Sequence, residues 1–460
     1  EGDVASYVNT IDLPTQRGLD PDDPAARGRV GECGMSISTT HDYEALLDGV
    51  PLEKALVIII GFDNVIPLLS LYAAYVLDTR KDDLSKTFHI CCNLFHHQWF
   101  WDSAAFPPRT AMKLQVELIK WFTKNCPRSY PGVIDGYNVA EAGAPPVLEV
   151  AFNLANTIEL MNHCIKAGLD PDEVASRIWG HPHISMKFYE EIAKFRASRR
   201  LWAKIMKERF GCSKPEALTY KAMVAQTGGS ELPAIEVHNN IIRCTIMAMA
   251  GMLGDVEGMW ISSFDEALGI PAEEAAQVAV RTYQILGEET DIPYVTDPFG
   301  GSYFMECLTN NIEEEVLKLL KKMDDMGGYL KCWESGWIRG EVERGGNERL
   351  RKIDKGEWVK VGLNKYRVEE VSPVRAFRCS EEAEKKAVAR VKQYRTDRDQ
   401  EKTKKALSKV REAAERIEKS WPESCGELFN ACVEAARAKA TAGEMHRILR
   451  EVFGYGYYSG

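Results

Sequence analysis

The sequence lacks any hydrophobic run long enough to cross a membrane and any excess of positive charge. Its 460 residues are 45% hydrophobic and 27% charged, and no stretch approaches the ~18 uninterrupted apolar residues of a transmembrane helix. Sixty-eight acidic residues outnumber 58 basic ones, which gives a net charge of −10 and disfavours a nucleic-acid backbone as the main ligand. We therefore expect a cytoplasmic globular protein without a membrane or nucleic-acid partner.

Common catalytic and metal-binding motifs are also absent. The twelve cysteines show no Cys-x-x-Cys spacing, which indicates reduced thiols and not a disulfide framework. The sequence contains no His-Glu-x-x-His, Gly-x-Ser-x-Gly, phosphate-loop or Gly-x-Gly-x-x-Gly motif. Histidines cluster at His96–His97 and His181–His183 without a carboxylate at ligand spacing, so we predict no metal site.

Short apolar runs alternate with helical patterns over the first three quarters of the chain, as in repeated β–α units with a parallel sheet. The clearest strand is Ala55 to Ile60, whose continuous β-branched residues indicate burial on both faces. We predict eight strands and hence an α/β fold, a (β/α)8 TIM barrel with a helical C-terminal extension. The predicted strands are residues 7–11, 55–60, 87–94, 132–137, 176–179, 221–226, 258–263 and, most weakly, 294–296.

Helices are expected between these strands and beyond them. Residues 150–165 carry apolar side chains at helical spacing and stop at Gly168, and the capping Asp170 with Pro171 begins the next helix. Residues 375–419 are rich in Lys, Arg and Glu, and 428–453 keep a helical period, which predicts long helices with solvated charged faces. The predicted domains are the barrel, residues 1–325, and a helical wrap, residues 326–460.

Polar or glycine-rich turns follow several predicted strands. In a parallel barrel the functional groups gather at the carboxyl ends of the strands, and paired glycines let a backbone approach a bulky ligand closely. Any one of these turns could be an ordinary connection, but five in register with the strands favour an enzyme with a large ligand. They are residues 12–15, 135–138, 226–230, 262–266 and 297–302.

Seven segments, in order along nearly the whole chain, resemble the coenzyme B12-dependent acyl-CoA mutases, the family typified by methylmalonyl-CoA mutase. Ile192–Ala197 with Arg199–Lys204 resembles a signature helix of that family. The other segments are Asp12–Gly18, Gly136–Tyr137 with Glu141–Ala144, Asn239–Arg243, Phe264–Leu268, Asp297–Tyr303 and Val361–Tyr366.

The resemblance implies an isomerase whose barrel is pierced by a tunnel for the pantetheine arm of CoA, and which binds adenosylcobalamin. In the family, homolysis of the cobalt–carbon bond gives a radical that abstracts a hydrogen from the acyl group, after which the thioester carbon migrates and the hydrogen returns. The cofactor carries this chemistry, while the protein orients the groups and excludes water.

A separate B12-binding subunit is expected for this chain. The family's B12 domain is marked by Asp-x-His-x-x-Gly, but none of the nine histidines has Asp two positions earlier, and the chain ends at Gly460. We therefore expect adenosylcobalamin to be bound jointly with a small Asp-x-His-x-x-Gly subunit, in a heterotetramer with two barrels. The chain also begins at the first strand, so we expect the segment that lines the family's substrate cavity to be supplied elsewhere or to be missing from this sequence.

The resemblance implies three catalytic residues, Tyr137, Asn138 and Gln226. Asn138 stands where the family has the histidine that hydrogen-bonds the thioester carbonyl, and its amide can still donate to an oxygen. The implied cofactor-binding residues are Glu266, aligned with the glutamate that touches the adenosyl ribose, and Ala267, Ile11 and Cys33.

The implied substrate-binding residues include the departures from the family pattern. Trp101 replaces the arginine that pairs with the carboxylate of methylmalonyl-CoA, Cys91 replaces a pocket glutamine and Val224 replaces a histidine, while Arg177 is retained. Arginine to tryptophan removes a bidentate clamp and adds a large apolar face, and an unpaired buried carboxylate would cost on the order of several kcal/mol. We therefore predict a bulky acyl group, aromatic or branched.

Two alternatives stay open from the sequence. A neighbouring position could pair the carboxylate instead of Trp101, and the substrate would then be methylmalonyl-CoA or a small branched acyl-CoA. The loss of the family's pocket His, Arg and Gln would also suit a catalytically silent barrel that partners an active subunit, although the retained Gln226 and Glu266 favour an active one.

Overall fold

The chain folds into two compact units. The computed structural model describes residues 6–61, 64–87, 90–92, 106–222, 224–367 and 379–454. Unit 1 comprises Glu1–Val133, Leu160–Ile178 and Arg378–Gly460, and unit 2 comprises Ile134–Glu159 and Trp179–Phe377. The boundary predicted at residues 325 and 326 stays a prediction.

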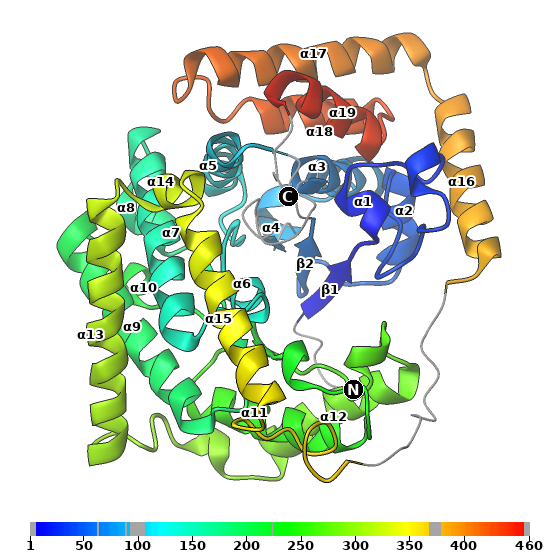
Figure 1. The fold of residues 1–460 in the computed structure, drawn as a ribbon. Helices are drawn as coiled ribbons and strands as arrows, with labels where there is room; N and C mark the ends of the chain where they lie inside the picture. Colours follow the sequence, from blue (N-terminus) through cyan, green and yellow to red (C-terminus); the bar gives the residue numbers. More distant parts are fainter. Residues whose placement is uncertain are drawn as a thin grey trace. The chain divides into compact units, whose positions relative to one another are not determined.

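Unit 1 contains a three-stranded parallel sheet in the order β1-β2-β3, of which β1 and β2 are labelled in Figure 1. Its strands are β1 (Ser6–Thr10), β2 (Leu56–Ile60) and β3 (Ile90–Cys92). Val57, Ile58 and Ile59 of the central strand are all buried, which confirms the expectation drawn from the continuous apolar run.

The helices of unit 1 include the charged C-terminal segment. In α17 the Thr403, Val410, Ala413, Ala414 and Ile417 side chains are buried, so one apolar stripe packs while the charged face is solvated. α17 contacts α18 and α19, and α18 packs on α3 (Figure 1). The helices are α1 (Leu13–Gln16), α2 (Thr40–Leu46), α3 (Val65–Ala74), α4 (Leu84–Thr87), α5 (Pro108–Asn125), α8 (Pro171–Ala175), α16 (Glu381–Thr396), α17 (Gln400–Ser420), α18 (Leu428–Arg437) and α19 (Ala442–Phe453).

Two further short sheets lie later in the chain. β4 (Gly132–Asp135) pairs with β5 (Ile178–His181), and the boundary between the units falls inside both strands. β6 (His183–Ile184), β7 (Ala225–Thr227) and β8 (Met259–Trp260) form a parallel sheet in that order. Pro182 separates β5 from β6, because proline has no backbone N–H to give to a ladder.

The remaining helices precede, separate and follow these strands along the chain. α9 packs on α13, α11 and α10. The helices are α6 (Tyr137–Glu141), α7 (Pro146–Lys166, shared with unit 1), α9 (Phe188–Phe210), α10 (Pro215–Leu218), α11 (Asn239–Leu253), α12 (Glu273–Glu288), α13 (Tyr303–Asp325), α14 (Tyr329–Glu334) and α15 (Trp337–Asp354).

The structure confirms a mixed α/β fold rich in helices, and seven of the eight predicted strand segments contain a strand. The eighth prediction is wrong, because Ile292–Tyr294 forms a 3-10 turn with a proline in its first positions, where proline's fixed φ is favoured. The segment 132–137 is shorter than predicted, since β4 ends at Asp135 and Tyr137 begins α6. The strands form three separate sheets, so the closed barrel stays a prediction.

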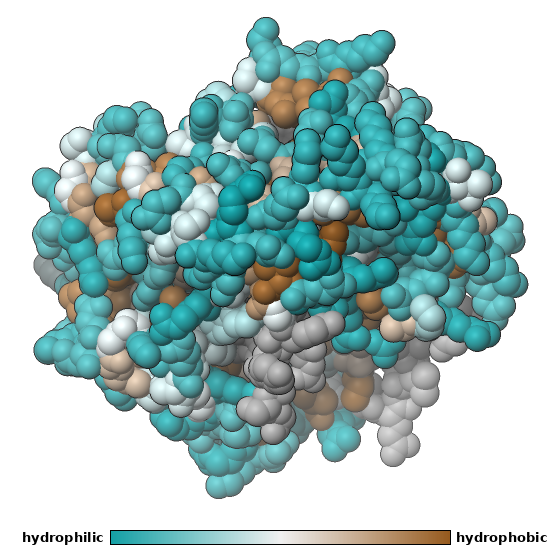
Figure 2. All heavy atoms as spheres, turned by 90° about the horizontal axis from the view of Figure 1, so that it is seen from above, coloured by the Kyte–Doolittle hydropathy of each residue, from teal (hydrophilic) through white to brown (hydrophobic). Residues whose placement is uncertain are grey.

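One face of the described surface can be judged by its hydropathy. The face in Figure 2 is mainly hydrophilic, with scattered apolar patches. Among the described helices, none combines the length and the apolar character needed to span a membrane. None of the ten cysteines whose side chains are described forms a disulfide.

A buried lysine joins two helices of unit 2 to β6. Lys194 Nζ of α9 lies 2.8 Å from Glu149 Oε2 and 2.5 Å from Glu191 Oε2, and it donates to the His183 carbonyl at 2.5 Å. Glu149 Oε1 accepts the His183 N–H at 3.0 Å. All three charged residues are at most 1% exposed. The attraction between their opposite charges therefore offsets the free energy lost when each charge left water.

Replacing this lysine should destabilise the protein strongly. We expect Lys194→Met to lower the free energy of unfolding by about 3–5 kcal/mol, because two buried carboxylates lose their cation. Urea unfolding followed by tryptophan fluorescence measures the difference. Lys207→Met, an exposed position of the same helix, is the matched control and should change the value by less than about 0.5 kcal/mol. Equal stability of the two variants would contradict a structural ion cluster.

Candidate active site

Polar side chains gather where β4 and β5 end. Asp135 is the last residue of β4 and His181 the last of β5. Asp135 Oδ1 lies 3.2 Å from His181 Nδ1, and the Asn138 side-chain amide donates to Asp135 Oδ2 at 2.6 Å. Asp135 is 2% and His181 9% exposed. A buried carboxylate thus holds an imidazole on one side and an amide on the other.

The His181 imidazole also contacts a residue of the next sheet and two aromatic rings. His181 Nε2 lies 3.1 Å from Gln226 Oε1 of β7. The Tyr137 ring stacks on His181 at a centroid distance of 5.3 Å and an angle of 22°, and Trp260 meets His181 edge-on at 5.8 Å. His181 therefore connects the predicted catalytic residues Asn138, Tyr137 and Gln226.

A second histidine makes a separate pair beside the first. His183 Nε2 lies 2.8 Å from Glu141 Oε1, and Glu141 Oε2 accepts the Ser230 N–H at 2.9 Å. Hydrogen bonds from His183 and Ser230 outweigh burial and hold the pKa of Glu141 below its usual range. A Cβ at Gly228 would overlap the His183 ring, so only glycine allows this turn to approach it so closely.

Glu266 has no such partner among the described side chains. It begins the 3-10 turn Glu266–Leu268. Burial, with smaller contributions from Glu141 and Asp265, raises the pKa of Glu266 to about 7. A Cβ added to Gly229 would lie 3.4 Å from the Tyr137 hydroxyl and 3.5 Å from Glu266 Cγ. Tyr137 and Glu266 therefore border the same glycine turn.

The structure brings four of the predicted site residues together in unit 2: Tyr137, Asn138, Gln226 and Glu266. Val224 is buried directly before β7, and Ala267 is exposed beside Glu266. Within the described residues, His, Cys, Asp and Glu form no group that could hold a metal ion.

Four other predicted residues, Ile11, Cys33, Cys91 and Arg177, lie in unit 1. Ile11 pairs with Met35, and the Leu13 N–H donates to the Glu32 carbonyl at 3.3 Å, so Ile11 and the exposed Cys33 lie near each other at the end of β1. Their predicted cofactor role stays a prediction.

Arg177 precedes β5 and donates from Nη1 to the carbonyls of Pro127 at 2.9 Å and Ser129 at 3.2 Å. Cys91 pairs with Ile58 in the sheet, and Trp101 lies outside the described residues. For these three residues, substrate binding stays a prediction.

Sequence reasoning missed Asp135, His181, His183 and Glu141 as site residues. The signal was present in part, because residues two apart on a strand face the same side and His181 and His183 flank one proline at the end of a predicted strand. Their carboxylate partners come from a segment more than 40 positions earlier, which only the fold brings near.

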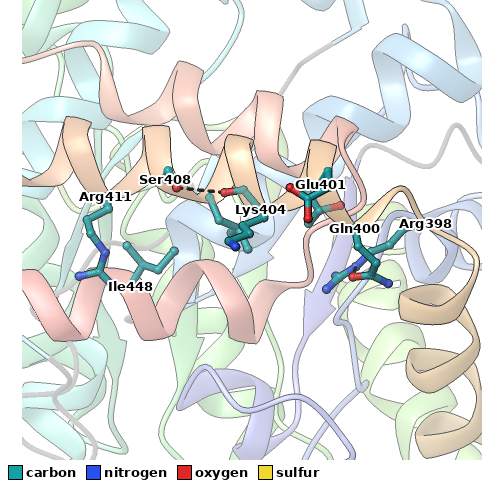
Figure 3. Close-up of a pocket in the computed structure, with 9 residues that line it drawn as sticks. Arg398, Gln400, Glu401, Lys404, Ser408, Arg411 and Ile448 are labelled. Carbon is teal, nitrogen blue, oxygen red and sulfur yellow. Dashed lines mark hydrogen bonds between the residues drawn. The ribbon is translucent and has the colours of Figure 1, made fainter.

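A surface hollow of about 370 Å³ lies between α17 and α19 in unit 1 (Figure 3). Arg398 donates to both carboxylate oxygens of Glu444 at 2.6 and 2.7 Å, and Arg411 pairs with Glu451. Its arginines are thus neutralised within the unit, and no predicted site residue lines it. The lining residues are Arg398, Gln400, Glu401, Thr403, Lys404, Leu407, Ser408, Arg411 and Ile448.

The raised pKa of Glu266 predicts a pH-dependent cost in stability. The folded state holds the proton more tightly than the unfolded state, so stability is lost as pH rises from about 4.5 to about 7. We expect Glu266→Gln to be more stable than the wild type at pH 8 by about 1–2 kcal/mol, with a smaller gain at pH 5. Urea unfolding at both pH values measures this. The exposed Glu288→Gln is the control, and an equal gain at both pH values would contradict the prediction.

The chain is similar over almost its whole length to known mutases. A family model described as Methylmalonyl-CoA mutase matches residues 5–455. Methylmalonyl-CoA mutase, mitochondrial, of Homo sapiens is 36% identical over 451 residues, which cover 96% of this chain and 58% of the human protein. Methylmalonyl-CoA mutase of Rhizobium meliloti (strain 1021) is 35% identical over 447 residues, which cover 96% of this chain and 61% of that protein. The chain thus spans about three fifths of the length of these relatives. It belongs to the methylmalonyl-CoA mutase family.

Proposed function

We propose that this chain is the acyl-CoA-binding part of an adenosylcobalamin-dependent mutase. The reaction moves the thioester carbon of an acyl-CoA to the neighbouring carbon, while one hydrogen atom moves the opposite way. The observation that carries the proposal is the cluster of Asp135, Tyr137, His181 and Gln226, which lies at strand ends in a chain of this family.

The strand order supports a (β/α)8 barrel as the framework of this site. In each of the three sheets, strands that are consecutive along the chain are also hydrogen-bonded neighbours. The orders are β1-β2-β3, β4-β5 and β6-β7-β8. A barrel of β–α units has this same order throughout. Functional groups at the carboxyl ends of β4, β5 and β7 then face one mouth of the barrel, as in other enzymes with this fold.

Adenosylcobalamin fits the donors and acceptors around Glu266. A Cβ at Gly229 would meet no atom closer than 3.4 Å, and the half-buried Glu266 carboxyl borders this turn as an acceptor for ribose hydroxyl groups. When bound, the cofactor supplies the radical chemistry that removes and returns a hydrogen atom. We propose that Glu266 holds the adenosyl group. No Asp-x-His-x-x-Gly motif lies within these 460 residues, which supports a B12-binding part outside them, and we propose that it is a separate subunit.

The site residues of this chain bind the thioester and orient it. The Tyr137 ring stacks on His181, and the Gln226 amide bonds to the same imidazole, so His181 holds both side chains before substrate arrives. The Asn138 amide donates to Asp135, which fixes the orientation of this side chain. These groups serve to orient the acyl thioester and to exclude water from it.

We propose a bulky acyl-CoA as the substrate, because Trp101 replaces the family's carboxylate-binding arginine. The named relatives, at 35–36% identity, favour methylmalonyl-CoA as the second candidate. The two candidates differ in one chemical demand: an acyl group with a free carboxylate needs a cation in the acyl pocket, whereas a branched or aromatic acyl group needs apolar surface.

Substrate preference should reverse when the arginine is restored. We expect the wild-type chain, with adenosylcobalamin and the B12-binding part, to isomerise an arylalkanoyl-CoA or a branched acyl-CoA at least about tenfold more efficiently (kcat/KM) than methylmalonyl-CoA. Trp101→Arg should reverse this order, because a bidentate ion pair contributes about 1.5–3 kcal/mol. Product analysis by liquid chromatography and mass spectrometry measures both rates.

The matched control is Trp101→Phe, which keeps an apolar ring and should keep the preference. Efficient turnover of methylmalonyl-CoA by the wild type would contradict the bulky-substrate proposal. A silent barrel would show no turnover of any acyl-CoA and no change in the visible spectrum of the bound cofactor.

A further inference from the structure

Both ring nitrogens of His181 face oxygen atoms. Nδ1 lies 3.2 Å from Asp135 Oδ1, and Nε2 lies 3.1 Å from Gln226 Oε1. A carboxylate oxygen and an amide oxygen accept hydrogen bonds but do not donate them. The arrangement is therefore satisfied only when His181 carries a proton on each nitrogen.

The protonation of His181 decides which end of the Gln226 amide faces the site. While Oε1 accepts from His181, the Nε2 amino group remains available as a donor, and no described residue accepts from it. If His181 loses the proton on Nε2, that nitrogen becomes an acceptor. Gln226 then keeps its bond only by turning its amide over, which presents the carbonyl oxygen to the site.

We propose that His181 is a positioning residue that sets, through its own protonation, whether Gln226 offers a donor or an acceptor to the carbonyl oxygen of the acyl thioester. The inference rests on the proposed function and deepens it. A thioester carbonyl is an acceptor, so it pairs with the donor orientation and is repelled by the other.

Four elements pack side chains around His181. Asp135 faces it from β4, Gln226 from β7 and Trp260 from β8. Tyr137 faces it from α6, and burial raises the pKa of this phenol above its usual range, so it stays neutral. His183 and Glu141, the nearest other titratable groups, pair with each other at 2.8 Å.

The proposal predicts that acyl-CoA affinity falls as the pH rises, because a neutral His181 ring turns the Gln226 donor away from the carbonyl oxygen. We expect isobutyryl-CoA to bind the full chain about tenfold more weakly at pH 8.5 than at pH 6, the effect of losing one hydrogen bond and gaining a repulsion. Isothermal titration calorimetry measures both values. The thioether analogue of isobutyryl-CoA has no carbonyl group, so its affinity should be independent of pH.

Three variants separate the orienting role from a structural one. His181→Gln places a permanent amide donor near the position of Nε2, so binding should stay tight and become independent of pH. His181→Phe keeps the stack on Tyr137 without a donor, so binding should be weak at both pH values. His238→Gln, at an exposed position of unit 2, is the control and should keep the wild-type pH dependence.

The outcomes distinguish this inference from the proposed function. No binding of any acyl-CoA at either pH would overturn both, whereas binding whose pH dependence persists in His181→Gln would overturn only the role of His181. A ligand-free test uses the chain labelled with nitrogen-15 histidine, where the resonance lost in His181→Gln identifies His181. We expect both of its nitrogens to be protonated at pH 6, and a neutral ring at that pH would overturn the proposal.

Discussion

The buried ammonium of Lys194 fixes the backbone on which the site is built. It binds Glu149 and Glu191 and takes the carbonyl of His183, while Glu149 takes the N–H of the same residue. β6 has only two residues and cannot hold its own position through strand pairing alone. Because the N–H and the carbonyl of His183 are both bound to buried charges, the backbone that carries His181 and His183 is fixed, and each imidazole is held facing its carboxylate.

Two carboxylates of the described site are each paired with a histidine. Asp135 pairs with His181, and Glu141 pairs with His183. Each pair removes the cost of burying a charge and orients a neighbour, Gln226 in the first case and the Ser230 turn in the second. A preorganised arrangement of this kind is what a mutase needs, since its cofactor performs the bond chemistry and its protein must hold the acyl group still.

The sequence predicted those parts of the fold that depend on local patterns. The continuous apolar run of β2, the Asp170–Pro171 start of α8 and the amphipathic C-terminal helices follow from periodicity and capping, and all are present. The strand expected at 294–296 is wrong because Pro293 in a short apolar run favours a 3-10 turn. Tyr137, Asn138 and Gln226 could be named from the family resemblance. The Asp135–His181 and Glu141–His183 pairs could not, because each joins residues more than 40 positions apart that only the pairing of strands brings into contact.

The most direct test of the proposed rearrangement follows the migrating carbon itself. The chain, reconstituted with adenosylcobalamin and the B12-binding part, is incubated in deuterated water with acyl-CoAs that carry carbon-13 at the thioester carbon. The products are then examined by carbon-13 NMR. We predict that in at least one bulky acyl-CoA the label becomes bonded to the neighbouring carbon and that no deuterium enters the product. A label that stays in place in every acyl-CoA that binds would contradict the account.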